Sequence, residues 1–496
     1  MPSPRSLVLI TVDCLRADHV GFLGYHRPTT PFLDGLAEES FVFPTAIVAG
    51  APTYYSFPAI LASRPPLALG RDVIGLAPGE PTLASALRQA GYTTAALAAG
   101  NPYLSRGFGY DAGFDTFQDF LNPEMAVVSN GSDGNRQSRL RGRLNRGLAK
   151  FCHKLPTAGS IYDELYFQYC QRVASQPSAV DTLRRCPTAD VIVDQARDWL
   201  AGAEPGPFFL WLHLMDPHAP YLPGNEAMAE MGVQSGSPFR LRYLNSYWNR
   251  SDLTPDRLER HRDEIIALYD ASIRWVDNQV ARLVDALGCF RLWDNCVLAL
   301  TADHGEEFLD HGGRYHAPPK VTEEIVHVPL LMRVPEAQKH PVSPAPFSLL
   351  HLAPTLLSAI GVPAPADFQG RSHWPEIQMG RGWGEEAIVE CVTECTNPFH
   401  PADRLGPRLL AVRDARYKLV LDFGGRREQL FDLQADPAEM QALPEHAEKA
   451  ARRRLLQRAL RHLANAPQSQ DAGLRLAAGL REIRQEGTSF GSTHAA

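Results

Sequence analysis

The sequence has no CxxC pair, no excess of basic charge and no hydrophobic run long enough to cross a membrane as a helix. Because its eight cysteines are scattered, their spacing does not indicate a paired-cysteine metal site or redox motif. The formal net charge of −7 leaves no overall basic footprint, so we expect no nucleic-acid partner. The apolar run LVLITV at 7–12 is too short for a signal-peptide core or a membrane span. We therefore expect a cytoplasmic protein with no transmembrane segment and with reduced thiols.

What the sequence does have is an alternation of short apolar runs and helical stretches. Its 496 residues, 44% apolar and 21% charged, have the profile of a globular enzyme. Strands alternating with helices predict an α/β fold with a mostly parallel, doubly wound sheet. The clearest helix is predicted at 254–287, where Thr254 can cap the helix and Pro255 can take its first position. Runs rich in β-branched and aromatic residues predict buried strands at 7–12, 93–99, 208–215, 296–302 and 328–334.

The pattern of alternating strands and helices changes twice along the chain, which predicts a division into domains. Residues 120–190 break the α/β pattern and contain NRQSRLRGRLNRGLAKFCHK, with seven Lys or Arg and no acid. This insertion reads either as a solvated basic helix or loop, or as a cap that attracts an anionic substrate. Antiparallel strand patterns and a helix at 445–464 predict a small C-terminal α+β subdomain over 384–465. Residues 1–383 then form the main domain, and 466–496 form a loose helical or disordered tail.

Acidic and histidine side chains stand at the ends of three of the predicted strands. Asp13 follows the first, Asp216 and His218 follow the third, and Asp303 and His304 follow the fourth. Parallel sheets bind ligands outside the carboxyl ends of their strands, so these residues are expected to converge. A single aspartate at a strand end is usually a helix cap or turn residue, but three such ends favour a divalent metal site.

A run of hydroxyl side chains, Thr53-Tyr54-Tyr55-Ser56, precedes a short helical segment. Pro58 suits the first position of that helix, whose free backbone N–H groups would face an anion. Because a cation lowers the pKa of a coordinated oxygen acid, an alkoxide held on a metal could attack a phosphorus or sulfur centre. The hydroxyls could also serve only to bond the backbone.

These segments together resemble the alkaline phosphatase superfamily, specifically its sulfatase-like branch, over about residues 5–440. TADHGEEFLDHG is the most specific match, and LITVDCLRADHVGFLGY and HLMDPHAPY match further family segments. The resemblance implies an alkaline-phosphatase-like α/β/α sandwich, with 1–383 as the catalytic domain. It implies a site that binds one divalent cation through Asp13, Thr53, Asp303 and His304. It also places His218 and His316 beside the transferred group or the leaving group, and Asn101 and Tyr54 among the substrate-binding residues.

The resemblance places the nucleophile at Thr53, where family sulfatases carry the Cys or Ser that becomes formylglycine. Thr cannot be converted in that way, although phosphoethanolamine transferases of the superfamily use a threonine. Ser56 is the alternative nucleophile, but Ile60 stands where the maturation arginine would be. Tyr54 and Tyr55 are expected to line the pocket, since a phenol offers little anion at neutral pH.

The departures from the sulfatase pattern favour phosphoryl chemistry. Phe57 replaces the arginine after the nucleophile, and Ala99 and Asn101 replace the Lys and His of a Gly-Lys-x-His segment. Cys14 replaces a second metal aspartate and His304 replaces an asparagine, which favours Mn²⁺ or Zn²⁺ over Ca²⁺ or Mg²⁺. We therefore predict a metal-dependent hydrolase that cleaves a phosphate monoester or diester through Thr53.

Several alternatives stay open from the sequence. The small-molecule substrate could instead be a sulfate ester or a phosphonate monoester, or the phosphoryl-linked group could pass to an alcohol acceptor. A non-catalytic binding protein is the remaining reading, which the complete Asp/Thr/Asp/His set disfavours. His311 and His327 flank the site but lack the Asp-x-x-x-His run of two-zinc relatives, so one metal is expected. His351 is expected to be structural.

Overall fold

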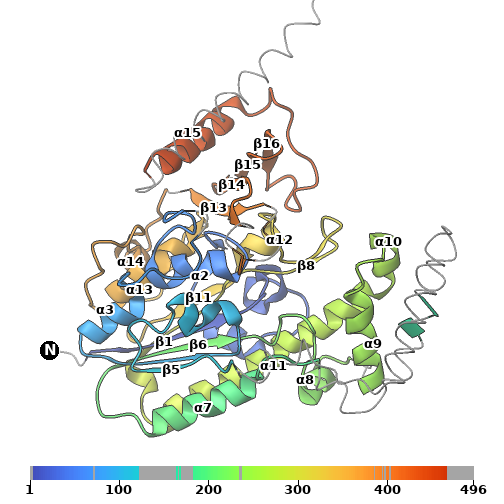
Figure 1. The fold of residues 1–496 in the computed structure, drawn as a ribbon. Helices are drawn as coiled ribbons and strands as arrows, with labels where there is room; N and C mark the ends of the chain where they lie inside the picture. Colours follow the sequence, from blue (N-terminus) through green and yellow to red (C-terminus); the bar gives the residue numbers. More distant parts are fainter. Residues whose placement is uncertain are drawn as a thin grey trace, which may run out of the picture.

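A computed structural model describes residues 4–70, 73–121, 164–165, 167–168, 183–233, 237–384, 386–393, 395, 398–400 and 404–465. Its centre is a seven-stranded sheet in the order β2-β11-β7-β1-β6-β4-β5 (Figure 1). Five neighbouring strands, from β7 to β5, pair in parallel; at one edge β11 pairs antiparallel with β7, and β2 pairs antiparallel with β11. The strands are β1 (Ser6–Val12), β2 (Phe41–Val42), β4 (Thr93–Ala98), β5 (Thr116–Gln118), β6 (Phe208–Leu214), β7 (Cys296–Ala302) and β11 (Leu330–Arg333).

Helices cover both faces of this sheet, which confirms the predicted α/β sandwich (Figure 1). One face carries α7 (Ala189–Ala201) and α11 (Arg262–Cys289), and the other carries α2 (Thr53–Ala62), α3 (Leu83–Gln89), α13 (Leu352–Ala359) and α14 (Trp374–Gln378). Every residue of β1, β6 and β7 is buried, as expected for strands covered on both sides. Smaller elements are α1 (Pro31–Ala37), β3 (Ala46–Ile47), α8 (Asn225–Glu230), α9 (Pro238–Trp248), α10 (Pro255–Leu258), β8 (Glu307–Phe308), β9 (Arg314–Tyr315), α12 (Glu323–Val326), β10 (His327–Val328) and β12 (Phe347–Ser348).

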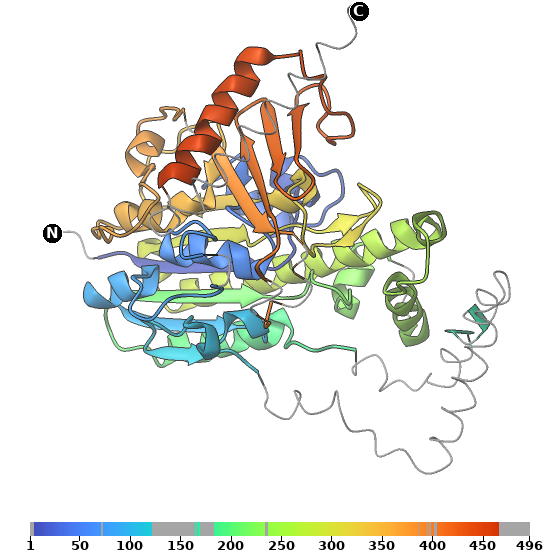
Figure 2. The same ribbon diagram turned by 45° about the horizontal axis from the view of Figure 1, so that its top comes forward.

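The C-terminal part of the described chain forms a separate antiparallel sheet packed under one long helix (Figure 2). The sheet contains β13 (Ala387–Val392), β14 (Arg408–Arg413), β15 (Tyr417–Asp422) and β16 (Arg427–Asp432), and the helix is α15 (Lys449–Asn465). Leu410, Leu419 and Leu430 of the sheet pack with Leu455 and Ala459 of the helix in a hydrophobic cluster of their own. The C-terminal α+β subdomain is thus present as predicted.

Two local predictions were wrong. The helix expected at 254–287 is divided, because a 3-10 turn at Glu259–His261 separates α10 from α11, and the side chain of Thr254 makes no cap hydrogen bond. Of the residues Pro255–His261 only Leu258 is buried, so no apolar stripe holds this part on the axis of α11. Pro58 lies inside α2 instead of beginning it. The helix begins earlier, at Thr53, so the hydroxyl run forms its first turn, and the rings of Tyr54, Tyr55 and Phe57 are buried.

The remaining boundaries stay predictions. The basic insertion at 120–190 lies mostly outside the described residues, and the tail at 466–496 lies entirely outside them. The division of the chain near residue 384 is likewise an expectation from the sequence. Among the described residues, no helix combines the length and the apolar character needed to span a bilayer.

Candidate active site

Adjacent parallel strands bring Asp13 and Asp303 to the same edge of the sheet. β1 and β7 are in register, with Val12 opposite Ala302, so the residues that follow them stand side by side. Both aspartates are fully buried. Asp216, at the end of β6, instead accepts a hydrogen bond from the backbone N–H of Ala189 at 2.9 Å, at the start of α7. Asp13 and Asp303 therefore belong to the site, whereas Asp216 has the helix-capping role common to strand-end aspartates.

Thr53 approaches this pair of carboxylates from the start of α2. Its Oγ1 lies 3.2 Å from Nε2 of His304, and the side chain is almost completely buried. As the first residue of the helix, Thr53 stands where backbone N–H groups have no intrahelical acceptor and where the helix dipole favours an anion. Ser56, the alternative nucleophile, is fully buried one turn on, and its Oγ has no hydrogen-bond partner among the described residues.

The local hydrogen bonds of His304 aim its second nitrogen into the site. Nδ1 lies 2.9 Å from the carbonyl oxygen of Gly305, and a carbonyl can only accept, so Nδ1 carries the proton. In the neutral imidazole Nε2 then carries a lone pair. This atom lies 3.2 Å from Thr53 Oγ1, 3.6 Å from an oxygen of Asp303 and 3.8 Å from an oxygen of Asp13.

The burial and the proximity of the two carboxylates favour a bound cation between them. Burial, and then the nearby charge of Asp13, raise the pKa of Asp303 to about 7. Burial also raises the pKa of Asp13, but the neighbouring imidazoles of His213, His218 and His304 outweigh it, so this pKa lies well below its usual value. Oδ2 of Asp303 is buried without a hydrogen-bond partner in the described part of the chain. An orphaned carboxylate oxygen beside a second carboxylate and an imidazole nitrogen fits a divalent metal ion.

His213 is a site residue that the sequence analysis missed. It lies in β6, fully buried, with Nδ1 3.0 Å from Oγ1 of Thr11 and Nε2 3.4 Å from Oδ2 of Asp13. Nε2 has no hydrogen-bond partner among the described residues. A histidine inside an apolar strand looks like a core residue in the sequence. Its link to the site comes from the register of the sheet, in which His213 pairs with Thr11, two positions before Asp13, on the neighbouring parallel strand.

A second group of side chains lies beside the carboxylates. The ring of His316 has its centroid 4.4 Å from that of His304 and 5.0 Å from that of His218. Nδ1 of His316 lies 3.3 Å from Oε1 of Glu306, a fully buried residue that the sequence analysis also missed. Burial raises the pKa of Glu306, but the neighbouring histidines, His316 first, lower it more strongly. The structure thus places His218 and His316 next to the side chains of the carboxylate cluster.

Cys14 turns its thiol into the cluster. The residue has a left-handed backbone conformation, with φ 62°, and its Sγ lies 3.0 Å from Oδ1 of Asp13 and 3.3 Å from Nδ1 of His316. Burial, and then the charges of Glu306 and Asp13, raise the pKa of this thiol well above its usual value. Without a cation beside it, Cys14 is therefore a neutral thiol that donates to Asp13.

Asn101 and Tyr54, both predicted to bind substrate, occupy different environments. The side-chain amide of Asn101 donates to Oδ2 of Asp13 at 3.1 Å, so it lies in the site as part of the carboxylate network. Tyr54 is 4% exposed, and its ring packs against Tyr55 and Tyr103 at centroid distances of 4.6 and 5.0 Å. Burial raises the pKa of Tyr54 further, so its phenol is neutral. Both substrate-binding roles stay predictions.

The other histidines named in the sequence have partners outside this cluster. Nδ1 of His311 lies 3.0 Å from Oε1 of Glu324, and Nε2 of His327 lies 3.0 Å from the carbonyl oxygen of Pro44. His351 accepts the backbone N–H of Arg371 through Nδ1 at 3.0 Å. These contacts agree with structural roles.

Comparison with known proteins settles the family of the chain. The family model for sulfatases matches residues 5–362. The chain belongs to the sulfatase family. This confirms the resemblance to that branch of the alkaline phosphatase superfamily, whose members are ester hydrolases that use a divalent metal ion. A second family model, for the C-terminal part of N-sulphoglucosamine sulphohydrolase, matches residues 315–466, which include the C-terminal sheet and α15.

Individual relatives of this sulfatase-family chain carry different activities. An arylsulfatase of Clostridium perfringens is 24% identical over 471 residues, covering 88% of this chain and 89% of the relative. An N-acetylglucosamine-6-O-sulfatase of Bacteroides thetaiotaomicron is 28% identical over 198 residues, which is 39% of this chain and only 34% of that protein. Among solved structures, a phosphonate monoester hydrolase from Silicibacter pomeroyi superposes with a TM-score of 0.65 at 22% identity, covering 94% of this chain and 96% of the other. The last likeness shows the fold.

Proposed function

We propose that the protein is a metal-dependent hydrolase that cleaves a small-molecule phosphate ester, with Thr53 as nucleophile. The observation that carries the proposal is the position of Thr53 Oγ1, 3.2 Å from Nε2 of His304 and at the N-terminus of α2. A hydroxyl in this place lies at the start of a helix and beside His304, whose Nε2 is also within 4 Å of the two buried carboxylates.

One divalent cation would be held by Asp13, Asp303, His304 and Thr53. Imidazole and carboxylate donors suit Mn²⁺ or Zn²⁺, and the thiol of Cys14 beside Asp13 adds a soft donor that favours Zn²⁺. When bound, the cation supplies the positive charge that lowers the pKa of the hydroxyl and offsets negative charge on the ester. A cytoplasmic location remains part of the proposal.

The side chains of the protein perform the remaining work. Thr53, whose hydroxyl proton would be lost to solvent, attacks the phosphorus while the bond from phosphorus to the leaving oxygen breaks, and backbone N–H groups of the first turn of α2 face the non-bridging oxygens. His218 and His316 stand where the leaving oxygen needs a proton, and Glu306 orients His316 through Nδ1. Nδ1 of His218 lies 2.6 Å from the carbonyl oxygen of Ala219, which leaves Nε2 for proton transfer. Water then releases the phosphoryl group from Thr53.

We favour a phosphate ester over a sulfate ester because uncharged side chains replace two positively charged residues of the sulfatase pattern. Phe57 is fully buried against Trp211 and His213, and Asn101 donates to Asp13, so these two positions offer no positive charge. The threonine cannot mature to formylglycine. The structural likeness to a phosphonate monoester hydrolase makes phosphonate esters the second candidate substrate class.

The test is a parallel assay of three proteins on a panel of nitrophenyl phosphate, bis-nitrophenyl phosphate, phenylphosphonate and sulfate esters, with Mn²⁺, Zn²⁺ or Ca²⁺. Wild type should cleave a phosphate ester fastest. Thr53→Ala should lose at least a thousandfold in kcat, since it removes the nucleophile. Ser56→Ala, a buried hydroxyl on the same helix, is the matched control and should stay within a few-fold. Full activity in Thr53→Ala would reject the nucleophile, and a preference for sulfate esters would reject the substrate class.

A further inference from the structure

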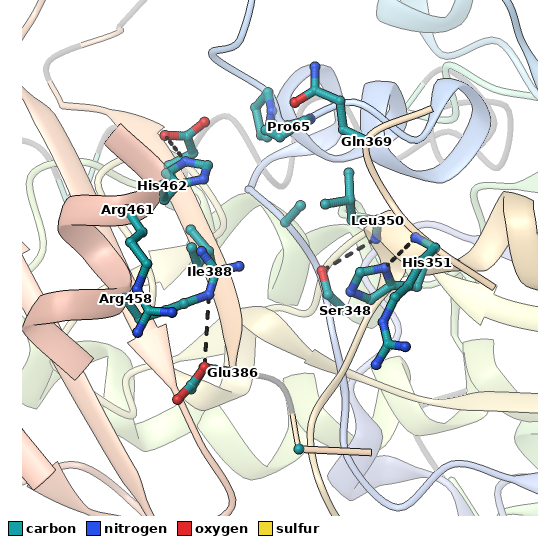
Figure 3. A pocket seen from close by; sticks show the side chains of 15 residues that line it. Pro65, Ser348, Leu350, His351, Gln369, Glu386, Ile388, Arg458, Arg461 and His462 are labelled. Atoms are coloured by element: carbon teal, nitrogen blue, oxygen red, sulfur yellow. Dashed lines mark hydrogen bonds and ion pairs between the residues drawn. The ribbon is translucent and has the colours of Figure 1, made fainter. Parts of the chain in front are cut away.

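A second, positively charged pocket lies away from the candidate active site, where α15 meets the main domain. The cavity has a volume of about 480 Å³. Figure 3 shows Arg458, Arg461 and His462 of α15 on one side, and Ser348, His351 and Gln369 of the main domain on the other. Arg371 also lines it. None of the side chains that surround Asp13 and Asp303 lines this pocket.

The pocket is separated from the nucleophile by the length of a helix. Thr53 begins α2, whereas Pro65 and Pro66, which line the pocket, follow its end. A ten-residue helix is about 15 Å long. The pocket is therefore a different place from the site where the ester would be cleaved.

The helix that forms one wall carries an unbalanced charge. α15 reads KAARRRLLQRALRHLAN, with six Lys or Arg and no acid. The two acids of the pocket are already matched by cations: Glu386 lies 3.9 Å from Arg454 and 3.8 Å from Arg458, and Glu390 lies 3.2 Å from Arg408 and 3.3 Å from His462. No carboxylate of the described chain pairs with Arg461. The pocket thus keeps a net positive charge that an anion would offset.

The size and the opposite wall indicate what kind of anion fits. A cavity of this volume lies in the range of sites for small organic molecules and exceeds the volume of an inorganic oxyanion. Ser348 and Gln369 line the main-domain side with hydroxyl and amide groups. These groups suit the hydroxyls of a sugar-sized molecule.

We propose that this pocket binds a sugar-sized phosphate or sulfate ester, with the oxyanion group beside Arg461 and Arg458 of α15 and the hydroxyl groups against Ser348 and Gln369. The inference is independent of the chemistry at Thr53. The bound molecule is held without being cleaved, because no nucleophile and metal-ligand cluster lines the pocket among the described residues.

The test is calorimetric titration of full-length, metal-loaded protein with glucose 6-phosphate, in the Thr53→Ala background so that the probe is not consumed. Arg461→Glu reverses the charge in the pocket. Arg453→Glu is the matched control, because Arg453 is an exposed cation of the same helix outside the pocket lining. We expect a binding component that weakens at least tenfold in Arg461→Glu and changes less than twofold in Arg453→Glu.

Titrations with three further ligands test which part of the molecule the pocket recognises. Glucose 6-sulfate should bind with the same dependence on Arg461, glucose should not bind, and inorganic phosphate should bind at least tenfold more weakly than the ester. Equal effects of the two charge reversals, or none from either, would overturn the site, since the binding would then reflect general charge or the active site alone. Binding of inorganic phosphate as tight as that of the ester would overturn the assignment to an organic ester. A thermal unfolding scan of each variant checks that the fold is retained.

Discussion

Thr53 Oγ1 and His304 Nε2 lie 3.2 Å apart although 251 positions separate them in the chain. One stands at the start of α2 and the other directly after β7, so the contact exists only because α2 packs over the carboxyl end of the sheet. The proton on His304 Nδ1 is fixed by Gly305, which makes the pair a hydroxyl donor facing a lone pair. The proposed nucleophile and the proposed cation site are therefore one structural unit.

The first prediction concerns removal of the metal. Asp13 and Asp303 are both fully buried, so at pH 8 the chelated protein holds two neighbouring buried carboxylates without the cation they would share. Adding Zn²⁺ or Mn²⁺ at a hundredfold excess over Kd should stabilise wild type by about 2.7 kcal/mol, visible as a higher Tm. Asp303→Asn should lose this metal-dependent shift, and its chelated form should melt above chelated wild type. An equal metal effect on both proteins would place the cation elsewhere.

The second prediction is that His213 takes part in holding the cation. Its Nε2 is buried without a hydrogen-bond partner in the described chain and lies 3.4 Å from Asp13. His213→Leu should weaken metal affinity by roughly 10- to 100-fold, the range seen when groups around a metal site are removed. His213→Gln, which keeps a polar atom near the position of Nε2, should restore part of the affinity. A drop in Tm with an unchanged metal Kd in both variants would show that His213 only fills the core.

The third prediction tests the attachment of the C-terminal subdomain. Lys418 of β15 is completely buried, 3.2 Å from Glu323 of α12 and 2.9 Å from Glu439. Lys418→Met would leave the buried carboxylate of Glu439 without its cation, whereas the half-buried Glu323 would keep Arg413, and the change should destabilise the protein by about 3 kcal/mol. Denaturant unfolding measures the change. The control Lys449→Met, at an exposed lysine, should cost less than about 0.5 kcal/mol. A comparable loss in both would remove the special role of Lys418.

The fourth prediction is a pH dependence at Glu390. Burial raises the pKa of this carboxyl, but Arg408 and His462 outweigh the burial and lower it to about 2. A carboxyl whose folded pKa lies below its unfolded value stabilises the fold above the unfolded pKa and loses that contribution as pH falls. Glu390→Gln should therefore be less stable than wild type by roughly 2–3 kcal/mol at pH 7.

The difference between the two proteins should be fully present at about pH 5 and shrink as pH falls toward 2. Urea unfolding at several pH values measures it. A difference that grows as pH falls from 5 toward 2 would contradict the assignment, because the sign of the pKa shift would then be opposite.

The sequence was a good guide wherever one segment carries the information. LVLITVD and CVLALTADH each show a buried strand followed by an acid, and both acids entered the site. The same pattern failed at Asp216, which caps α7, because the strand-end position does not state which way a side chain turns. A different pattern failed at residues 254–287. The helical spacing of apolar residues was extended over a polar stretch at its start, and this concealed the break between α10 and α11.

The sequence by itself determined the class of fold, the family and the residue types of the site, because strand periodicity and strand-end acids are local properties of the chain. Tertiary structure alone decided that His213 and Glu306 join that site, since each owes its place to neighbours on other strands and loops. It also created the cationic pocket, because the positive charges of α15 meet Ser348 and Gln369 only when the C-terminal helix docks on the main domain. Local sequence patterns indicate the secondary structure of a segment, whereas tertiary packing decides which side chains from distant segments come into contact.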